Sequence, residues 1–516
     1  MAAVPALAQE DPFAAAQAQF AAVVASLRSQ EARALTHSDL EREIEAQGHE
    51  LLRLLYQGHL DARGPGAAAG PVCGADGVAR GQARLQPRTL ATVFGPVTVR
   101  RLGYGAAGAA SLHPQDAALN LPPERYSHEL RRQAAVEAAK GSFDEAVQSV
   151  ARHTATPVPK RQVEALVARA AQDFDTFYAG REAPAAAGGP TGAVLVLTVD
   201  GKGVVMRPAD LREPTRTAAA QRTHKLATRL SKGEKRHAKR MATVAAVYTI
   251  APSVRTPEEV GRRLAPLRAA DDARRPRPEH KRVWASLEHT PQQVLAEAFR
   301  EAEHRDPAHA KTWVAVVDGN KPQLALLRKL ARARGIALTV VLDIIHVVEY
   351  LWKAARAFHP EASPALEAWV TERLLQILRG RASHVAAGMR RSATRRGLAA
   401  TVRQPVDTCA NSLLTYAPYL HYDRYLAAGL PIATGVIEGA CRHLVTDRMD
   451  LTGARWSLAG AEAVLRLRAL RSSRDFDEYW QFHEAQEHQR HHVARYANGT
   501  VVPVRERRRA HLRVVK

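Results

Sequence analysis

The sequence predicts an α/β protein in which a mixed sheet flanked by helices forms the central domain. Three observations indicate this class. Apolar runs at residues 194–199, 241–250, 313–317 and 336–342 have the length of buried strands, and a short run at 204–206 is expected as a separate strand after the glycines at 201 and 203. Between the runs at 313–317 and 336–342, apolar residues recur at helical spacing, and a strand–helix–strand unit of this kind places its two strands parallel. A long helical block then follows from about residue 346 to residue 430.

The first part of the chain is expected to be helical. Residues 1–84 have apolar positions at helical spacing until a Gly/Ala/Pro stretch at 64–69 interrupts them, which predicts a helical N-terminal region and a linker. Residues 85–125 contain an alternating segment that turns at Gly95 and Pro96. Alternation around such a turn predicts a small β-hairpin element.

Residues 126–182 are expected to form a three-helix unit. Ser142 followed by Glu145 is a capping box that begins its second helix. After a short turn, a third, long helix begins with the basic pair Lys160 and Arg161. This outline is that of a helix-turn-helix DNA-binding unit, although generic helical hairpins share it.

The charge of the chain favours a polyanionic partner. Its 516 residues include 74 Lys and Arg against 52 Asp and Glu, a formal net charge of +22. Such an excess binds nucleic acid through phosphate contacts, but it also suits a ribosome- or membrane-surface-associated protein. Three cysteines are too few for a disulfide framework, and no apolar run reaches the roughly 18 residues of a membrane span. A cytoplasmic protein that does not enter the membrane is the expectation.

Three carboxylates are candidates for holding divalent cations. Asp200 and Asp318 each follow an apolar run and precede a glycine, and Glu438 lies in a later segment with glycines on both sides. A few converging carboxylates suffice for Mg²⁺, and a pair of such ions supports displacement at a phosphodiester. Each residue also has a structural interpretation. An Asp-Gly pair after a strand is often a turn, and Glu438 can pair with Arg442 on a helix surface.

Asp343 complicates the choice because it too ends an apolar run. If a helix begins there, Asp343 and His346 share one face of it. The two residues then form an N-cap and a structural histidine, a substrate-positioning pair, or part of the metal site. Zinc is disfavoured, since no further Cys or His follows at ligand spacing.

The segment at residues 429–445 resembles bacterial insertion-sequence transposases of the Kra family, which belong to the DDE superfamily. The resemblance runs nearly end to end, and the long segment around Glu438 is its most specific part. Other similar segments are residues 125–127, 173–174, 198–203, 317–320, 343–352, 447–449, 452–456 and 461–465.

The resemblance implies a ribonuclease-H-like catalytic domain with a helical insertion before the glutamate. Its first part would span residues 193–350, the insertion 351–430, and the glutamate-bearing helices 431–472. Residues 473–516 are polar and basic, and we expect most of this tail to be poorly ordered or associated with DNA.

The resemblance also implies the catalytic residues. Asp200, Asp318 and Glu438 would be catalytic and hold Mg²⁺, for which Mn²⁺ can substitute, and His346 would have a positioning role. Asp318 is preferred because the second aspartate of Mutator-like relatives follows the fourth strand, and Asp343 is the runner-up. The implied reaction is hydrolysis at the element's ends, followed by attack of the freed 3′-hydroxyl on target DNA.

Implied partners are double-stranded DNA, as the inverted repeats and as target, and further copies of the chain in a homo-oligomer associated with the bacterial nucleoid.

Trp456 would stack on a base or fill the core. The basic run at residues 222–240 is a candidate for end binding or a solvated loop. Two other functions stay open, a nuclease that cannot join DNA and an inactive transposase-derived repressor. Residues expected to contact DNA are Lys160, Arg161, Arg442, Arg448 and Arg455.

Overall fold

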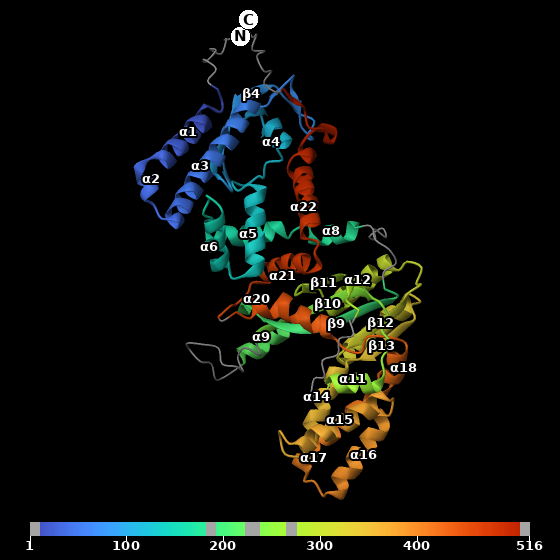
Figure 1. The fold of residues 1–516 in the computed structure, drawn as a ribbon. Coiled ribbons are helices and arrows are strands. Elements are labelled where there is room, and N and C mark those ends of the chain that lie inside the picture. The colour runs from blue at the N-terminus through green and yellow to red at the C-terminus, as the bar shows by residue number, and fades with distance from the viewer. Residues whose placement is uncertain (1–10, 182–191, 222–237, 265–275, 452, 506–516) are drawn as a thin grey trace. The chain divides into compact units, whose positions relative to one another are not determined.

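The computed structural model describes residues 11–181, 192–221, 238–264, 276–451 and 453–505 (Figure 1). The chain divides into two compact units. The first, here called the terminal unit, consists of residues 1–177 together with 476–516, and the second, the central unit, consists of residues 178–475. Within the described ranges, no helix is both long and apolar enough to cross a membrane.

The terminal unit begins with the predicted helical region. Its helices are α1 (Ala14–Arg28), α2 (Gln30–Ala34) and α3 (His37–Arg63). A short helix, α4 (Pro114–Ala118), follows the small strands β1 (Ala67–Ala68), β2 (Val72–Cys73), β3 (Ala79–Arg80), β4 (Gln82–Leu85), β7 (Leu102–Ala106) and β8 (Ala109–Leu112). The chain adds one more short strand near its end, β14 (Val504–Arg505), which pairs with β1.

The predicted β-hairpin is present as the antiparallel pair β5 (Arg88–Thr92) and β6 (Gly95–Val99). Its turn lies at residues 93–94, before the predicted position, because Thr92 pairs directly with Gly95. Gly95 has φ +117°, a conformation that glycine adopts without steric cost, so the glycine marks the start of the second strand.

The three-helix unit is confirmed as helical, with one correction. Its helices are α5 (His128–Lys140), α6 (Phe143–His153) and α7 (Lys160–Ala170), and a further helix, α8 (Phe174–Gly180), follows. The capping box of Ser142 and Glu145 begins α6 as predicted. The third helix is shorter than predicted, since α7 ends at Ala170.

The expected C-terminal tail is wrong for most of its length. Residues Phe476–His491 form a helix, α22, that belongs to the terminal unit. Aromatic residues at helical spacing give α22 a buried face within a polar composition, including Phe476, Tyr479 and Trp480. The Tyr479 hydroxyl donates a hydrogen bond of 2.6 Å to the Ala170 carbonyl at the end of α7. Only residues 506–516 of this expected tail lie outside the described structure.

The central unit contains a mixed sheet of five strands in the order β11-β10-β9-β12-β13, which confirms the α/β class (Figure 1). β9 pairs antiparallel with β10, and β10 with β11, whereas β12 runs parallel to both β9 and β13. The strands are β9 (Val194–Val205), β10 (Lys239–Ile250), β11 (Glu279–Ser286), β12 (Thr312–Val317) and β13 (Leu338–Leu342).

Two features of this sheet differ from the prediction. β9 is one strand of 12 residues that continues through Asp200, so Asp200 does not end a strand. The glycines after it were expected to break the strand, but Gly201 and Gly203 pair with Thr243 and Met241 of β10. β11 was not predicted at all. Its sequence is half polar, and it becomes a strand through its pairing with β10.

Helices cover both faces of the sheet. The crossover between β12 and β13 is α13 (Lys321–Ala333), and α12 (Pro291–Arg305) contacts β9 and β10. The block predicted at residues 351–430 is helical, but it begins earlier than expected, because the boundary at residues 350 and 351 lies inside α14. This block, here called the insertion, packs on alternate sheet residues such as Val196, Val314 and Val341. It consists of α14 (Ile344–Ala355), α15 (Pro364–Leu378), α16 (Ala382–Arg395), α17 (Ala400–Thr415) and α18 (Tyr422–Ala427).

The central unit contains further helices outside the insertion. After the insertion come α19 (Gly435–Ala440), a π-helical segment (Cys441–Thr446), α20 (Asp447–Met449) and α21 (Leu458–Ser473), the last of which packs on β11. The unit also contains α9 (Glu213–Ala220) and α11 (Pro257–Leu264).

Tyrosines of the insertion bond to the ends of two parallel strands. The Tyr416 hydroxyl donates to the Gly319 carbonyl at 2.6 Å, just beyond β12. The Tyr422 hydroxyl donates to the carbonyl of Leu342, the last residue of β13, at 2.8 Å. These buried or half-buried hydrogen bonds fix the positions at which both strands end.

Candidate metal centre

A hollow of about 70 Å³ in the central unit brings the predicted acidic residues together. Asp200, Asp318, Asp343 and Glu438 all line it, and so does His346. The other lining residues are Val199, Ile345, Glu349, Thr434 and Ile437. Residues predicted from segments more than 200 positions apart in sequence therefore face one small space.

The strand register explains why three of these residues meet. In the parallel ladder of β9 and β12, Val316 lies opposite Thr198, and continuing by two residues brings Asp318 level with Asp200. Val317 lies opposite Leu342 in the ladder of β12 and β13, so the next residue pair is Asp318 and Asp343. The three aspartates form one row across neighbouring strands, and β9 passes through the row instead of ending there.

Asp200 is half-buried and has a hydrogen bond to each carboxylate oxygen. Its Oδ1 accepts from the Gly201 amide at 2.6 Å, and its Oδ2 accepts from the Cys441 thiol at 3.3 Å. Burial and the charge of Asp200 raise the pKa of the Cys441 thiol, so the sulfur keeps the hydrogen that it donates. Cys441 is a neighbour of the site that the sequence did not indicate.

Asp318 is half-buried and more open to a ligand. Its Oδ1 accepts from the Asn320 amide at 3.0 Å, and no donor in the described part of the chain contacts its Oδ2. Gly319 follows with φ +92°, and a Cβ at this position would meet the Leu342 and Tyr416 side chains at 3.0 and 3.2 Å. Glycine is therefore required immediately after Asp318.

Asp343 is only 3% exposed and is used as a structural acceptor. Its Oδ1 accepts from the Ile345 amide at 3.0 Å as the N-cap of α14, and from the Thr434 amide at 3.3 Å. Its Oδ2 accepts from the Thr434 hydroxyl. Burial raises the pKa of Asp343, while these hydrogen bonds act to lower it. The N-cap that was expected as one alternative from the sequence is observed.

Glu438 projects from α19 and is exposed. Burial, together with the negative charge of Asp343, raises the pKa of Glu438, and the charges of Glu349 and Asp200 act in the same direction. Lys and Arg do not occur among the described residues that line the hollow. The negative charge of the carboxylates that line the hollow is therefore not balanced by a Lys or Arg in this lining. Carboxylate oxygens are the ligands that Mg²⁺ and Mn²⁺ prefer, so these residues fit a divalent cation.

His346 lies in the first turn of α14, half-buried, beside this group of acids. Its ring meets the Tyr350 ring edge to face with 5.0 Å between centroids. This contact fixes the imidazole along the wall of the hollow, which is compatible with a positioning role.

The arginines that were expected to contact DNA differ in their exposure to solvent. The Arg442 side chain is 82% exposed and Arg455 is also exposed, so both can reach a ligand. Arg448 is wrong as a phosphate contact, because it is 2% exposed and its guanidinium lies 4.7 Å from the centre of the Trp456 ring. Trp456 is 6% exposed, and its indole N–H donates to the Met449 carbonyl, so it fills the core and does not offer a face to a base.

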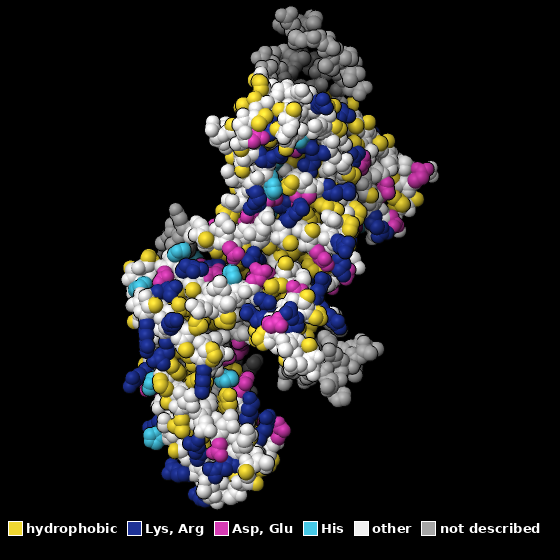
Figure 2. Space-filling model, turned by 180° about the vertical axis from the view of Figure 1, so that it is seen from behind, with side chains coloured by type: hydrophobic (Ala, Val, Ile, Leu, Met, Phe, Trp, Pro, Cys, Tyr) yellow, Lys and Arg dark blue, Asp and Glu magenta, His cyan; other side chains and the backbone are white. Residues whose placement is uncertain are grey.

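The other basic candidates lie on the surface. Lys160 forms an ion pair with Asp144 at 2.7 Å, and since both are exposed, this pair costs little to break. Arg161 is exposed. Most of the basic run at residues 222–240 lies outside the described residues. Figure 2 shows Lys and Arg side chains spread over the face in view and mixed with acidic ones, without a single dominant patch.

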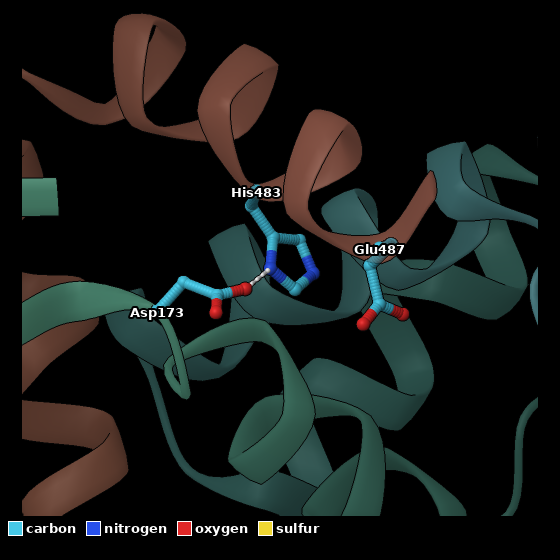
Figure 3. Close-up of side chains that lie close together, drawn as sticks. All are labelled: Asp173, His483 and Glu487. Carbon is cyan, nitrogen blue, oxygen red and sulfur yellow. Dashed lines mark hydrogen bonds and ion pairs between the residues drawn. The ribbon is translucent and has the colours of Figure 1, made fainter. Parts of the chain in front are cut away.

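A second group of acids and histidine lies in the terminal unit, where Asp173 faces His483 and Glu487 (Figure 3). The ligand atoms of these three residues are within 4.8 Å of one another. However, Arg131 Nη1 donates to His483 Nε2 at 2.9 Å and to Glu487 Oε2 at 2.7 Å. His483 Nδ1–H must then donate to Asp173, at 2.7 Å. The guanidinium occupies the place that a cation would need.

This second group is therefore a buried charge network that joins α22 to the rest of the terminal unit. Burial acts to raise the pKa of Glu487, but the charge of Arg131 outweighs it and lowers the pKa to about 2. The sequence could not indicate the network, because Arg131 and Asp173 lie more than 300 residues from His483 and Glu487.

Comparison with known proteins adds no relative to these observations. No protein-family model matches the sequence, and no curated protein matches it. The chemistry of the hollow follows from its own residues, namely carboxylates that can hold hard cations and two exposed arginines in the segment that carries Glu438.

Proposed function

We propose that this protein is a DDE transposase, similar to the Kra family, that cleaves DNA at the ends of an insertion sequence and joins them to target DNA. The convergence of Asp200, Asp318 and Glu438 on one hollow without Lys or Arg is the observation that carries the proposal. These three residues would hold Mg²⁺ or Mn²⁺. The net charge of +22 suits a DNA substrate.

The topology of the sheet supports a ribonuclease-H-like assignment. Three antiparallel strands are followed by two parallel strands, and the first strand lies in the middle of the sheet. The helical block between β13 and α19 lies where the resemblance implies an insertion before the glutamate.

The chain's residues would act mainly by positioning. Bound Mg²⁺ activates the attacking oxygen and stabilises the leaving oxygen of a phosphodiester. Asp200 and Asp318 offer carboxylate oxygens from neighbouring strands, and Glu438 offers one from α19. Arg442 and Arg455 are exposed and would neutralise the DNA backbone beside these acids. The reaction needs no covalent intermediate on the protein.

Asp318 is the better second aspartate. A metal ligand needs an oxygen with a free lone pair facing the site, and Asp318 Oδ2 meets no donor in the described residues. Asp343 uses both oxygens to accept hydrogen bonds from Thr434, and one of them also accepts from Ile345. This difference supports the choice made from the order of strands.

Binding of the element's ends is assigned in this proposal to the terminal unit. The α6–turn–α7 arrangement with exposed Arg161 supports a helix-turn-helix role. We propose that the protein acts as a homo-oligomer, because two ends must be processed together. A nuclease without joining activity and an inactive repressor are outcomes that the following experiment distinguishes.

The test is a strand-transfer assay with Mg²⁺ or Mn²⁺ and oligonucleotides taken from the inverted repeats that flank the gene. The expected result is cleavage followed by joining, lost in Asp200→Asn and retained in Asp450→Asn, an exposed acid outside the hollow. Cleavage without joining would indicate the nuclease. Binding without any metal-dependent cleavage would indicate the repressor.

A further inference from the structure

We propose that Thr434 and Cys441 are positioning residues that set the geometry of the metal centre by bonding the glutamate-bearing segment to Asp343 on one side and to Asp200 on the other. This inference rests on the proposed function, because it assigns these residues a role toward the metal that the hollow would hold.

Thr434, Glu438 and Cys441 are spaced at i, i+4 and i+7, which places them along one side of a helical segment. Thr434 precedes α19, Glu438 lies within it, and Cys441 begins the π-helical segment that follows. Thr434 and Cys441 are buried, whereas Glu438 between them is exposed. The glutamate is thus flanked by two buried polar groups, each bonded to an aspartate.

Thr434 joins the start of α19 to the start of α14. Its amide and its hydroxyl donate to different oxygens of Asp343, whose Oδ1 also caps α14 through Ile345. The hydroxyl oxygen lies 3.5 Å from Glu438 Oε1 as well, but its single hydrogen serves the nearer Asp343. This two-point contact fixes the turn from which Glu438 projects.

Cys441 acts on the other aspartate. Its thiol contacts Asp200 Oδ2 at 3.3 Å while the Gly201 amide holds Oδ1, so rotation of the carboxylate is restricted. The helix widens into a π-helical segment at Cys441, and such widened turns occur often at functional sites. Both contacts use neutral donors, which orient a carboxylate without cancelling the charge that attracts a cation.

Loss of either donor should weaken metal binding in a protein that still folds, although Thr434→Val should also lower stability because buried Asp343 Oδ2 loses its donor. Thr434→Val keeps the shape of the side chain and removes its hydroxyl, and Cys441→Ala removes the thiol. Each substitution is expected to weaken Mn²⁺ binding by about three- to tenfold, the effect of about one hydrogen bond. Thr434→Ser and Cys441→Ser keep a donor and should stay within about twofold of the wild type.

The experiment is an electron paramagnetic resonance titration of the full-length chain with Mn²⁺ in the absence of DNA, with folding checked by circular dichroism. Cys409→Ala serves as control, because Cys409 is a buried cysteine of α17 outside the hollow. The inference holds if the valine and alanine variants lose affinity and the serine variants and the control do not.

Two results would overturn it, and they are distinguishable. If the wild type binds Mn²⁺ and all variants bind equally well, the positioning role is wrong and the proposed function stands. If the wild type does not bind Mn²⁺, the metal centre itself is wrong. Should Thr434→Val fail to fold, the comparison of Cys441→Ala with Cys441→Ser decides alone.

Discussion

Asp318 and Asp343 lie level with each other just beyond the ends of the neighbouring strands β12 and β13, yet their surroundings differ. Asp318→Asn should lower cleavage on the order of a thousandfold or more with little change in thermal stability, because it removes a proposed metal ligand. Asp343→Asn should instead destabilise the fold by about 1–3 kcal/mol, since it weakens the acceptor of three hydrogen bonds. Single-turnover cleavage and thermal melting measure the two effects. Loss of cleavage only in the Asp343 variant would reverse the assignment.

Glu438 should be a source of instability when no metal is bound. Its folded pKa is raised above the ordinary value of 4.5, so the folded state favours the protonated form. The stability that protonation gives is fully present below pH 4.5 and is lost as pH rises through the folded pKa. At pH 7, Glu438→Gln should therefore raise the melting temperature of the metal-free protein.

The same melting experiment is repeated in the presence of Mn²⁺. Mn²⁺ should stabilise the wild type and leave Glu438→Gln nearly unchanged, because ligand binding to the folded state raises its stability. A metal-free variant that melts below the wild type would show that Glu438 forms a stabilising contact, in conflict with the charge repulsion inferred here.

Residues with a candidate chemical role could be selected from the sequence more readily than the burial of individual side chains could be predicted. An Asp-Gly pair after an apolar run is common, so Asp200 and Asp318 could be selected only in combination with the more specific segment around Glu438. Core packing was one of the two positions expected for Trp456, whereas the burial of Arg448 could not be predicted, because it depends on packing against Trp456, which bridges to Met206 just beyond β9. Cys441 was missed because its partner lies 241 residues away.

Among the secondary-structure elements, the insertion should influence catalysis through Tyr416. Tyr416→Phe removes the hydrogen bond to the Gly319 carbonyl and should lower cleavage about fivefold through looser placement of Asp318, at a cost of about 1 kcal/mol. Tyr419→Phe is the matched control, because Tyr419 accepts a hydrogen bond from exposed Arg328. Equal effects of the two substitutions would argue against a link between the insertion and the site.

Most elements could be predicted, and the failures have physical causes. The end of β9 was misplaced because glycine usually weakens a strand, but here the long ladder with β10 stabilises it. α22 was expected to be poorly ordered because its composition is polar, although its apolar face is present at helical spacing. β11 has no alternating pattern and could be recognised only from its partner.

The two units should lose stability in acid through buried ion pairs of their own. The pKa of Glu487 in the terminal unit and that of Glu301 in the central unit are both lowered to about 2. A carboxyl with a lowered folded pKa contributes stability that is present above its unfolded value of 4.5 and is lost as pH falls from there toward 2. Circular dichroism melts between pH 7 and pH 2.5 should show this loss.

A single substitution can assign part of this effect to one unit. Glu487→Gln leaves buried Arg131 without one of its carboxylate partners and should destabilise the terminal unit by about 3–5 kcal/mol. The Mn²⁺ affinity of this variant should stay unchanged. A Mn²⁺ affinity that falls together with the stability would show that Asp173, His483 and Glu487 hold the metal instead. Calorimetry and Mn²⁺ titration on the same variant separate the two results.

For the whole chain, the order of the five strands, with β11 at one edge, could not be predicted, whereas the α/β class, the strand–helix–strand unit and the convergence of the acids were within reach of the sequence. The division into units was not. The predicted boundaries treat residues 473–516 as a separate tail, but α22 joins the terminal unit through hydrogen bonds to residues such as Ala170 and Asp173. Contacts between segments 300 residues apart leave no local signal.

The most direct test is anomalous diffraction from crystals of the protein grown with Mn²⁺. The proposal predicts anomalous density in the hollow, bonded to carboxylate oxygens of Asp200, Asp318 and Glu438. Absence of density there, or density only beside Asp173, His483 and Glu487, would contradict it.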